Sequence, residues 1–291
     1  MKKKLPLIAI ILIFTAGVCV LCYPFFSSVV NNFVARQQAF ENMERIKVLP
    51  KHEKSSLYDE AKKYNQSLTD NVILTDPFDE KAYKRIGAAY YKSFDVDGKG
   101  LIGYIDVPKI NVYLPVYHGT SEDVLEKYAG HLENTSLPIG GKSTHAVISA
   151  HSAFPGQTFF DYLTDITEGD EFYVHVLDRT LKYEVDQVSV VLPKETKALR
   201  ISKGEDYVTL VTCTPYSVNS HRLLVRGKRV PYDEASYSTP PSLTVEDGNL
   251  FILGFKLPLW AVGIGLFVLI AAAVIIPVMI VRRRKTREDK K

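Results

Sequence analysis

Two long apolar segments near the ends of the chain most constrain how it can fold. Residues 5–26 and residues 257–281 contain no charged side chain. Each segment is long enough to cross a hydrocarbon core of about 30 Å as a helix. Basic residues lie on the outer flank of each segment, in residues 1–4 and in residues 282–291, and such flanks favour the cytoplasmic side. We therefore expect two transmembrane helices, two short cytoplasmic tails and one external domain between the helices.

The first apolar segment has a second interpretation. A basic start followed by an apolar stretch is also typical of a signal peptide that is cleaved on export. The end of the segment, "VCVLCYPFF", lacks the small residues of a cleavage site, which favours a retained signal anchor over 5–26. The second segment, 257–281, has no such alternative and predicts a membrane helix.

The positive charge of the chain belongs to its tails. The formal net charge is +3; Lys2–Lys4 contribute +3 and residues 282–291 contribute +5, so the rest of the chain carries −5. A basic patch is the electrostatic signature of nucleic-acid binding, and the region between the apolar segments lacks one. The sequence therefore predicts no nucleic-acid partner.

Residues 101–232 have the pattern of a mainly β domain. Short runs such as "LIGYIDV", "DYVTLVTC" and "HRLLVRGKRV" are rich in Val, Ile, Tyr and Thr, and Gly, Pro, Asp and Ser separate them. This pattern is typical of an all-β sandwich or barrel. Two segments inside it, "SEDVLEKYAGHLE" and "FFDYLTDI", are expected to be helices.

The regions on either side of this domain have a different composition. Residues 27–49 and 52–68 space their apolar side chains at helical intervals and predict two amphipathic helices. Residues 69–100 contain Pro77 and a polar, glycine-containing turn, which predict a loop. Residues 233–256 include "STPPS" and are expected to be a polar linker to the second apolar segment.

Cys213 is the only cysteine between the two apolar segments. A leftover cysteine in an external domain indicates intermolecular pairing or a reactive thiol. Arg222 follows nine residues later, and a hairpin of "EDYVTLVTC" and "RLLVRGKRV" would bring the thiol and the guanidinium together. A nearby cation favours the thiolate, and a guanidinium can hold a carbonyl or an oxyanion. An inert buried cysteine and a solvated arginine remain the alternatives.

A nucleophilic thiol needs a proton carrier, usually a histidine. His221 adjoins Arg222, but neighbouring residues of a strand point to opposite faces, so His221 would face away from the site. His151 ends the predicted strand "HAVISAH" and enters a loop, where functional residues concentrate. Spacing alone favours His151 and leaves four other histidines open: His118, His131, His145 and His175.

Taken together, these motifs resemble the sortase family of cysteine transpeptidases. "TLVTC", the arginine nine residues later and "HAVISAH" carry the general resemblance. "YHGTSEDVLEKYAGHLENTSLPIGG", "TPYSVNSHRLLVRGKR", "TDPFDE" and the second apolar segment resemble the class C, pilin-polymerising branch. The resemblance spans residues 30–281. It implies a closed sortase-type β-barrel as the catalytic core at 101–232, with helices and a lid loop at 27–100.

The resemblance also implies roles for single residues. Cys213 would attack the threonyl carbonyl of an LPXTG-like sorting signal, and a lysine of another pilin subunit would then take over the acyl group. His151 would transfer protons, and Arg222 would hold the substrate and stabilise the oxyanion. In the lid, Asp76 would face Arg222, and Phe78 would cover the thiol and the imidazole.

The expected partners are therefore pilin subunits that carry such a signal and an acceptor lysine, and a lipid bilayer. No cofactor and no metal are expected. The expected location is the cell membrane of a Gram-positive bacterium, with the catalytic domain outside and both termini in the cytoplasm.

Two features depart from the family pattern, and two other functions compete. The lid aromatic is Phe78 where relatives use tryptophan, and the loop after His151 reads "SAFPGQTFF" where many relatives begin with arginine-glycine. A housekeeping sortase that attaches proteins to peptidoglycan is disfavoured by the lid and the second apolar segment. A non-enzymatic surface protein should carry Leu-Pro-x-Thr-Gly upstream of that segment, and residues 240–260 contain none.

Overall fold

The computed structural model describes residues 45–68, 75–79, 90–91, 93–234 and 237, together with 17, 20, 23, 27–35, 37, 39, 41 and 43, and three strands at 243–246, 249–252 and 255–258. Apart from a few residues, the two predicted membrane helices at 5–26 and 257–281 lie outside this set. No helix within the described set has both the length and the hydropathy needed to cross a membrane.

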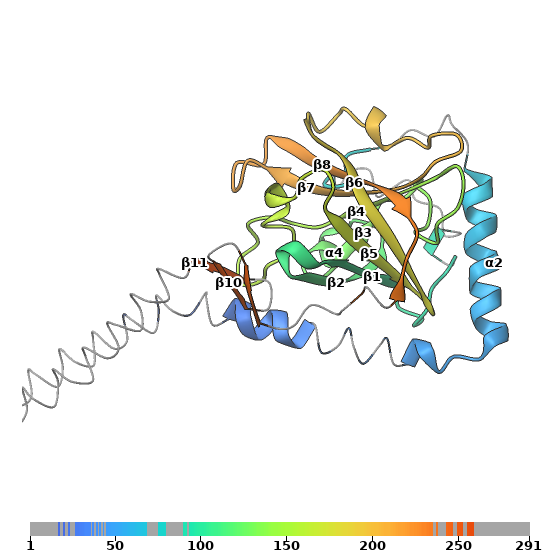
Figure 1. The fold of residues 1–291 in the computed structure, drawn as a ribbon, viewed down its shortest axis with the longest axis horizontal. Helices are drawn as coiled ribbons and strands as arrows, with labels where there is room; N and C mark the ends of the chain where they lie inside the picture. Colours follow the sequence, from blue (N-terminus) through green and yellow to red (C-terminus); the bar gives the residue numbers. More distant parts are fainter. Residues whose placement is uncertain are drawn as a thin grey trace, which may run out of the picture.

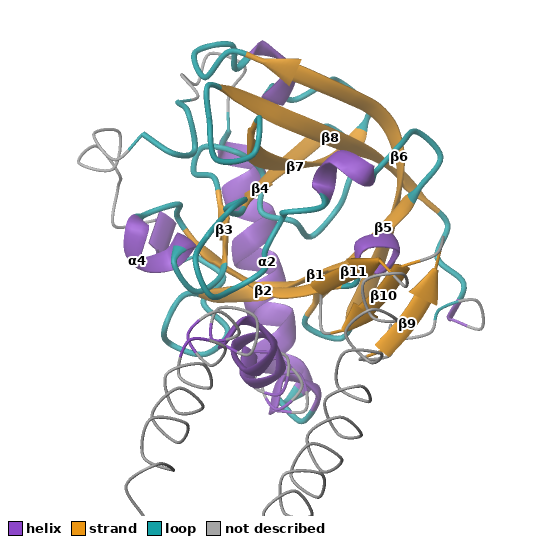
Figure 2. Ribbon diagram, turned by 90° about the vertical axis from the view of Figure 1, so that its left-hand side faces the viewer, coloured by secondary structure: helices purple, strands orange, loops and turns teal. Residues whose placement is uncertain are grey.

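The core of the protein is a closed barrel of eight strands (Figures 1 and 2). The strands are β1 (Leu101–Val107), β2 (Val112–His118), β3 (Ala129–His131), β4 (Thr144–Ser149), β5 (Glu171–Val176), β6 (Arg179–Val191), β7 (Asp206–Thr214) and β8 (His221–Val230). Their order around the barrel is β1-β2-β3-β4-β7-β8-β6-β5. The prediction of a mainly β, closed barrel is confirmed.

The strand directions determine where functional side chains can meet. β4 and β7 are parallel, so both end at the same edge of the barrel, and β8 begins there because it is antiparallel to β7. The loops after β4 and β7 therefore leave the barrel side by side. This edge carries the candidate site.

Close packing inside the barrel depends on a glycine in β8. The rings of Phe172 and Tyr183 stack with centroids 5.5 Å apart and planes 14° apart. Gly227 lies against both, and a Cβ at this position would overlap the Phe172 ring. An alanine there would force these fully buried rings to move, which close-packed interiors resist.

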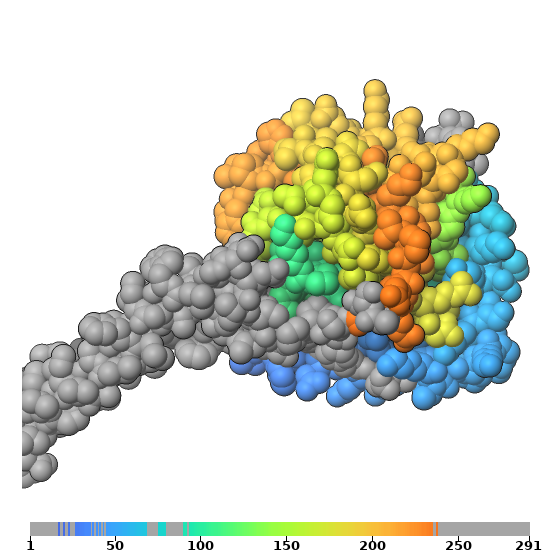
Figure 3. Space-filling model, in the orientation of Figure 1, coloured from blue at the N-terminus to red at the C-terminus, as the bar shows by residue number. Residues whose placement is uncertain are grey.

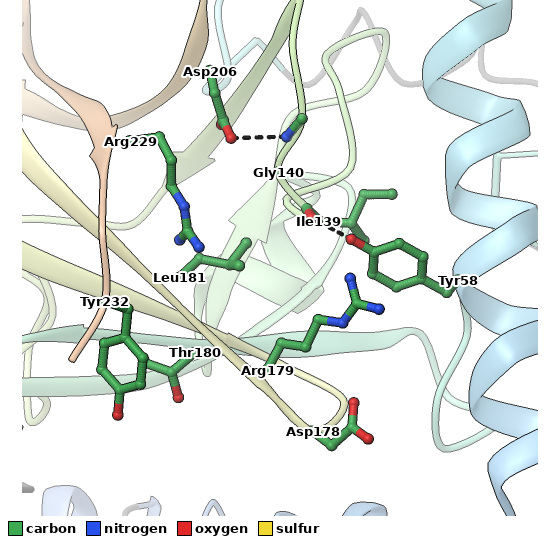
Figure 4. Close-up of a pocket in the computed structure, with 11 residues that line it drawn as sticks. Tyr58, Ile139, Gly140, Asp178, Arg179, Thr180, Leu181, Asp206, Arg229 and Tyr232 are labelled. Atoms are coloured by element: carbon green, nitrogen blue, oxygen red, sulfur yellow. Dashed lines mark hydrogen bonds between the residues drawn. The ribbon is translucent and has the colours of Figure 1, made fainter. Parts of the chain in front are cut away.

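One helix lies along the side of the barrel. α2 (Lys51–Ser67) places Leu57, Ala61 and Tyr64 at intervals of four and three residues, and Ala61 is fully buried. The Tyr58 hydroxyl donates to the Ile139 carbonyl at 2.9 Å (Figure 4). The Asn65 amide both donates to and accepts from the Leu137 backbone. These bonds hold α2 on the barrel wall, and in the space-filling view this segment runs along the right-hand side of the molecule (Figure 3).

Two predicted helices inside the barrel domain are much shorter than expected. In "SEDVLEKYAGHLE" only α4 (Glu122–Leu125) is helical, and Ala129–His131 form β3 instead. The backbone passes so close to the Gly119 carbonyl that only a glycine fits at Gly130, and strand pairing prevails there. In "FFDYLTDI" a single 3₁₀ turn forms, η3 (Leu163–Asp165), and two more such turns are η2 (Pro108–Ile110) and η4 (Lys197–Leu199).

The region expected to be a linker contains a small sheet. Between 233 and 258 the chain forms β9 (Leu243–Glu246), β10 (Asn249–Ile252) and β11 (Phe255–Pro258), with β10 in the middle. Glu246 pairs with Asn249, which leaves the dipeptide Asp-Gly between the strands, a sequence favoured in two-residue hairpins. β11 also takes the first two residues of the apolar segment 257–281.

Candidate active site

Cys213 and Arg222 lie opposite each other in the β7–β8 ladder. Cys213 is the second-last residue of β7, Arg222 is the second residue of β8, and the two are direct register partners. Directly opposed residues point to the same face of a sheet. Both are buried, with 8% and 9% of their surfaces exposed. The hairpin expected from their spacing in the sequence is present.

His151 follows β4 and lies beside the end of β7. The residues on either side of it are bonded to that strand, because the Thr212 hydroxyl donates to the Ala150 carbonyl and the Ser152 hydroxyl donates to the Cys213 carbonyl, both at 2.8 Å. Residues 151–161, here called the histidine loop, close on themselves through a bond from the Phe160 amide to the His151 carbonyl at 2.9 Å. The backbone of His151 is therefore held next to the backbone of Cys213.

A turn at residues 75–79, the lid turn, covers this edge of the barrel. Asp76 accepts from Arg222 Nε at 2.8 Å and from Nη2 at 2.7 Å. The Phe78 ring lies 5.0 Å from the Arg222 guanidinium carbon and 5.7 Å from the His151 ring centroid. The structure thus brings together all five residues singled out in the sequence.

The third nitrogen of Arg222 is held by its own hairpin. Nη1 donates to the carbonyl oxygens of Asn219 and His221, both at 3.0 Å. These bonds are independent of the lid turn. The guanidinium is anchored on one side by β8 and its preceding loop, and its Nε–Nη2 edge faces outward to the lid.

Comparison with known proteins identifies the family of this site. Residues 105–230 match the family described as "Sortase domain". A crystal structure of sortase C-1 from Streptococcus pneumoniae is 45% identical, with a TM-score of 0.63, and the match covers 68% of this chain and 100% of that one. The chain belongs to the sortase family.

Other comparisons agree on the family and point to class C. The pilus-related sortase C of Group B Streptococcus is 47% identical, with a TM-score of 0.60, over 67% of this sortase and 97% of that chain. Sortase A of Bacillus anthracis is 24% identical over 79% of this sortase and 96% of its own length. The protein is a cysteine transpeptidase, and the solved structures named here are sortases C.

Burial is the main reason that the thiol favours its neutral form in this sortase. Burial raises the pKa of Cys213, Arg222 lowers it, and Asp76 raises it further. Burial also lowers the pKa of His151, while Glu126 opposes that change. Under the lid turn, both groups therefore favour their uncharged forms.

Asp76 acts on both partners of the hairpin. Burial works against the charge of Arg222, but the hydrogen bonds and charge of Asp76 raise the pKa of that guanidinium. The carboxylate thus stabilises the cation and at the same time opposes ionisation of the thiol. Removal of Asp76 would leave Arg222 as the charge that acts on Cys213.

The other histidines of the barrel are engaged elsewhere. His131 is bonded to the Tyr90 hydroxyl and the Ser136 carbonyl, and burial lowers its pKa to about 3. His145 is bonded to Arg200 and Thr209. The rest are bonded to backbone or side chains away from the thiol: His118 to Gly100 and Ser93, His175 to Thr180, and His221 to Ser220.

Sequence reasoning missed an aromatic partner of the imidazole. The Phe154 ring stacks on His151, with centroids 5.2 Å apart and planes 20° apart. Phe154 in turn packs edge-on against Phe159, which is fully buried. Nothing in the sequence "SAFPG" indicated which side chain would stack on the histidine.

The helical segment 27–35 supports the outer side of the histidine loop. The Asn31 amide donates to the Gly156 carbonyl at 2.8 Å, and the Thr158 amide donates to Asn32 Oδ1 at 3.2 Å. The hydroxyls of Ser28 and Thr158 are also hydrogen-bonded, at 3.2 Å. The loop is therefore held by β7 on one side and by this segment on the other.

A separate polar pocket of about 560 Å³ lies at the opposite end of the β7–β8 ladder (Figure 4). Asp206 at the start of β7 and Arg229 near the end of β8 both line it, with Tyr58 from α2. It contains none of the five site residues. Among the described residues, no group of His, Cys, Asp and Glu is arranged to hold a metal ion.

Proposed function

We propose that this sortase cleaves an LPXTG-like sorting signal and joins the new carboxyl end to a lysine of another pilin subunit. The observation that carries the proposal is the meeting of Cys213, His151 and Arg222 at one barrel edge. A nucleophile, a proton carrier and an oxyanion-stabilising cation are the parts that acyl transfer needs.

In the first half of the reaction, once the lid turn has moved, His151 takes the proton of Cys213, and the resulting thiolate attacks the carbonyl carbon of the threonine in the signal. The carbonyl oxygen becomes an oxyanion, which the Arg222 guanidinium stabilises. Protonated His151 gives its proton to the nitrogen of the leaving glycine. The carbon–nitrogen bond breaks, the C-terminal fragment leaves, and a thioester remains on Cys213.

In the second half, a lysine amine attacks the thioester carbonyl. Neutral His151 takes a proton from the attacking amine, and the carbon–sulfur bond breaks to restore the thiolate. The product is an isopeptide bond between two subunits. Each proton that His151 gives in the first half is regained in the second, so the enzyme returns to its starting state.

The lid turn would hold the resting enzyme inactive. Asp76 occupies the Nε–Nη2 edge of Arg222, which is the edge available to a substrate oxygen. The Phe78 ring packs against the imidazole, with centroids 5.7 Å apart. Substrate entry therefore requires that the lid turn move, after which Phe78 no longer shields the thiol.

Two structural neighbours and the two apolar segments support the pilin substrate and the location. One structural neighbour is the pilus-related sortase C of Group B Streptococcus, and the structure of another, a sortase C of Streptococcus pneumoniae, is described as informative on pilin substrate specificity. The apolar segments 5–26 and 257–281 support attachment to the membrane of a Gram-positive bacterium, with the barrel outside.

The test uses the full chain in detergent with an LPXTG peptide and two amine acceptors. One acceptor is a pilin-type peptide with a free lysine side chain, and the other is a peptidoglycan-type peptide amine. We expect release of the C-terminal fragment, a thioester at Cys213 by mass spectrometry, and transfer to lysine. Equal release by Cys213→Ala would refute the catalytic proposal, and transfer only to the second acceptor would refute pilin polymerisation.

A further inference from the structure

Asp161 closes the histidine loop with its carboxylate. Oδ1 accepts from the Ala153 amide at 3.0 Å, and Oδ2 accepts from the Phe159 amide at 2.8 Å. The Tyr216 hydroxyl, from the loop between β7 and β8, lies close enough to Asp161 to lower the pKa of its carboxyl group. Asp161 therefore lies where the two loops that leave this edge of the barrel approach each other.

The two backbone bonds fix the part of the loop that orients the imidazole. Ala153 lies between His151 and Phe154 and has a φ of 61°, a conformation that residues with a Cβ adopt only when their surroundings impose it. Its amide is held by Asp161. Because Phe154 stacks on the His151 ring, the position of that ring depends on the conformation at Ala153.

The loop that contains Tyr216 also supports Arg222. Tyr216 belongs to a turn in which the amides of Val218 and Asn219 both donate to the Pro215 carbonyl at 3.0 Å. The Asn219 carbonyl at the end of this turn accepts from Arg222 Nη1. Tyr216 is 62% exposed, so burial of its ring does not account for its place beside Asp161.

Asp161 does not act through its charge on the imidazole. Burial raises the pKa of Asp161, while the Phe159 and Ala153 amides and the Tyr216 hydroxyl lower it. The charge that affects the pKa of His151 is that of Glu126. The carboxylate of Asp161 serves as an acceptor for neutral donors, and its effect on the site is geometric.

We propose that Asp161 is a positioning residue that sets the relative placement of His151 and Arg222, with Tyr216 as the link between their loops. The proposal rests on the proposed transpeptidation, because it assigns the two side chains to one reaction. Neither Asp161 nor Tyr216 contacts the reacting atoms. Loss of either should therefore reduce the rate of the chemical step more than the binding of the signal peptide.

The kinetic test compares Asp161→Asn and Tyr216→Phe with the unchanged full chain. An asparagine keeps the size of the side chain but can accept with only one oxygen. For Asp161→Asn we expect kcat for peptide cleavage to fall by about 100-fold, the loss that a misplacement of about 1 Å produces, with KM within about twofold. Tyr216→Phe keeps both bonds from the loop backbone to Asp161, and its kcat should fall about tenfold.

Asp170→Asn is the matched control. Asp170 also accepts from a nearby backbone amide, that of Thr167, and from two side chains, those of Thr167 and Lys109. It stabilises the turn before β5 and bonds to none of the site residues. Its loss should lower the melting temperature and leave kcat unchanged. Unchanged kcat in both Asp161→Asn and Tyr216→Phe would overturn the proposal.

A second measurement does not depend on turnover. In the folded chain with isotope-labelled histidines, the His151 ring should give one sharp NMR signal, which broadens or moves in Asp161→Asn and Tyr216→Phe but not in Asp170→Asn. Identical His151 signals in all four proteins would refute the positioning role. If the unchanged chain cleaves no LPXTG peptide while the His151 signal responds as expected, the proposed reaction fails and the positioning of the loop stands.

Discussion

Arg222 and Asp76 are 146 residues apart in the chain and form an ion pair through two parallel hydrogen bonds, at 2.8 and 2.7 Å. The pair uses the Nε–Nη2 edge of the guanidinium, while Nη1 stays bonded to the carbonyls of Asn219 and His221. Departure of Asp76 therefore frees one edge of Arg222 without releasing the side chain. We therefore expect the lid turn to act by covering a guanidinium that is already in position.

Replacement of Asp76 by asparagine should make the thiol more acidic. Asp76 raises the pKa of Cys213 and Arg222 lowers it, so removal of the negative charge shifts the pKa downward. The second-order rate of alkylation by iodoacetamide, measured against pH, should reach its midpoint at a lower pH in Asp76→Asn than in the unchanged chain.

The control for this measurement is Asp186→Asn. Asp186 forms a similar pair of hydrogen bonds, at 2.9 and 3.0 Å, with Arg226, which lies on the same strand as Arg222. Asp186 is not among the groups that shift the pKa of Cys213. Its variant should keep the original midpoint. A midpoint that does not fall in Asp76→Asn would show that the carboxylate does not raise the pKa of the thiol.

Replacement of Phe78 by alanine should increase access to the thiol. The ring lies against His151 and over Arg222, and burial raises the pKa of Cys213. Alkylation of Cys213 should become faster at every pH, and the midpoint of the pH curve should not rise, because less burial favours the thiolate. A shift of the midpoint without a faster rate would contradict the shielding role.

Of the two histidines near the hairpin, only His151 should be needed for turnover. His221 is bonded to Ser220, and its neighbour Arg222 faces the lid turn. His151→Ala should reduce kcat by about 100-fold or more, the range for a lost acid–base group, whereas His221→Ala should stay close to the original value. The opposite result would show that His221, and not His151, transfers the proton.

The stability of the barrel should fall in acid because of His131. Burial lowers the pKa of this residue from 6.5 to about 3, so below about pH 6.5 the unfolded chain takes up a proton that the folded chain does not. The stabilisation is fully present above this pH, and up to about 1.4 kcal/mol is lost per pH unit on the way down to the folded pKa.

His131→Gln should weaken this pH dependence. Urea unfolding of the full chain in detergent between pH 4 and pH 7 gives the slope, and His52→Gln, on the exposed face of α2, is the control. The control should keep the original slope. An unchanged slope in His131→Gln would show that the imidazole is protonated in the folded barrel.

The β7–β8 hairpin was predictable because its signals are local. The run "HRLLVRGKRV" coincides with β8, and "DYVTLVTC" coincides with β7 except for its last residue. Register then follows from the spacing of Cys213 and Arg222. The barrel itself follows from many short β runs in one domain.

The contacts between loops could not be read from the sequence. Asp161 and Tyr216 meet only because β4 and β7 are parallel and end at one edge, and no local pattern specifies a parallel pairing over sixty residues. The stacking of Phe154 on His151 likewise has no local signal in the sequence. The short α4 was missed for a related reason, since β2 and β4 together impose a strand on Ala129–His131.

The contacts of Asn31 and Asn32 with Gly156 and Thr158 affect the choice of fragment for solution work. A shortened protein that starts at α2 would keep every strand of the barrel and all five site residues. It would lack the side chains that brace the outer face of the histidine loop. Rate constants from such a fragment would describe His151, the proposed proton carrier, with the outer support of its loop removed.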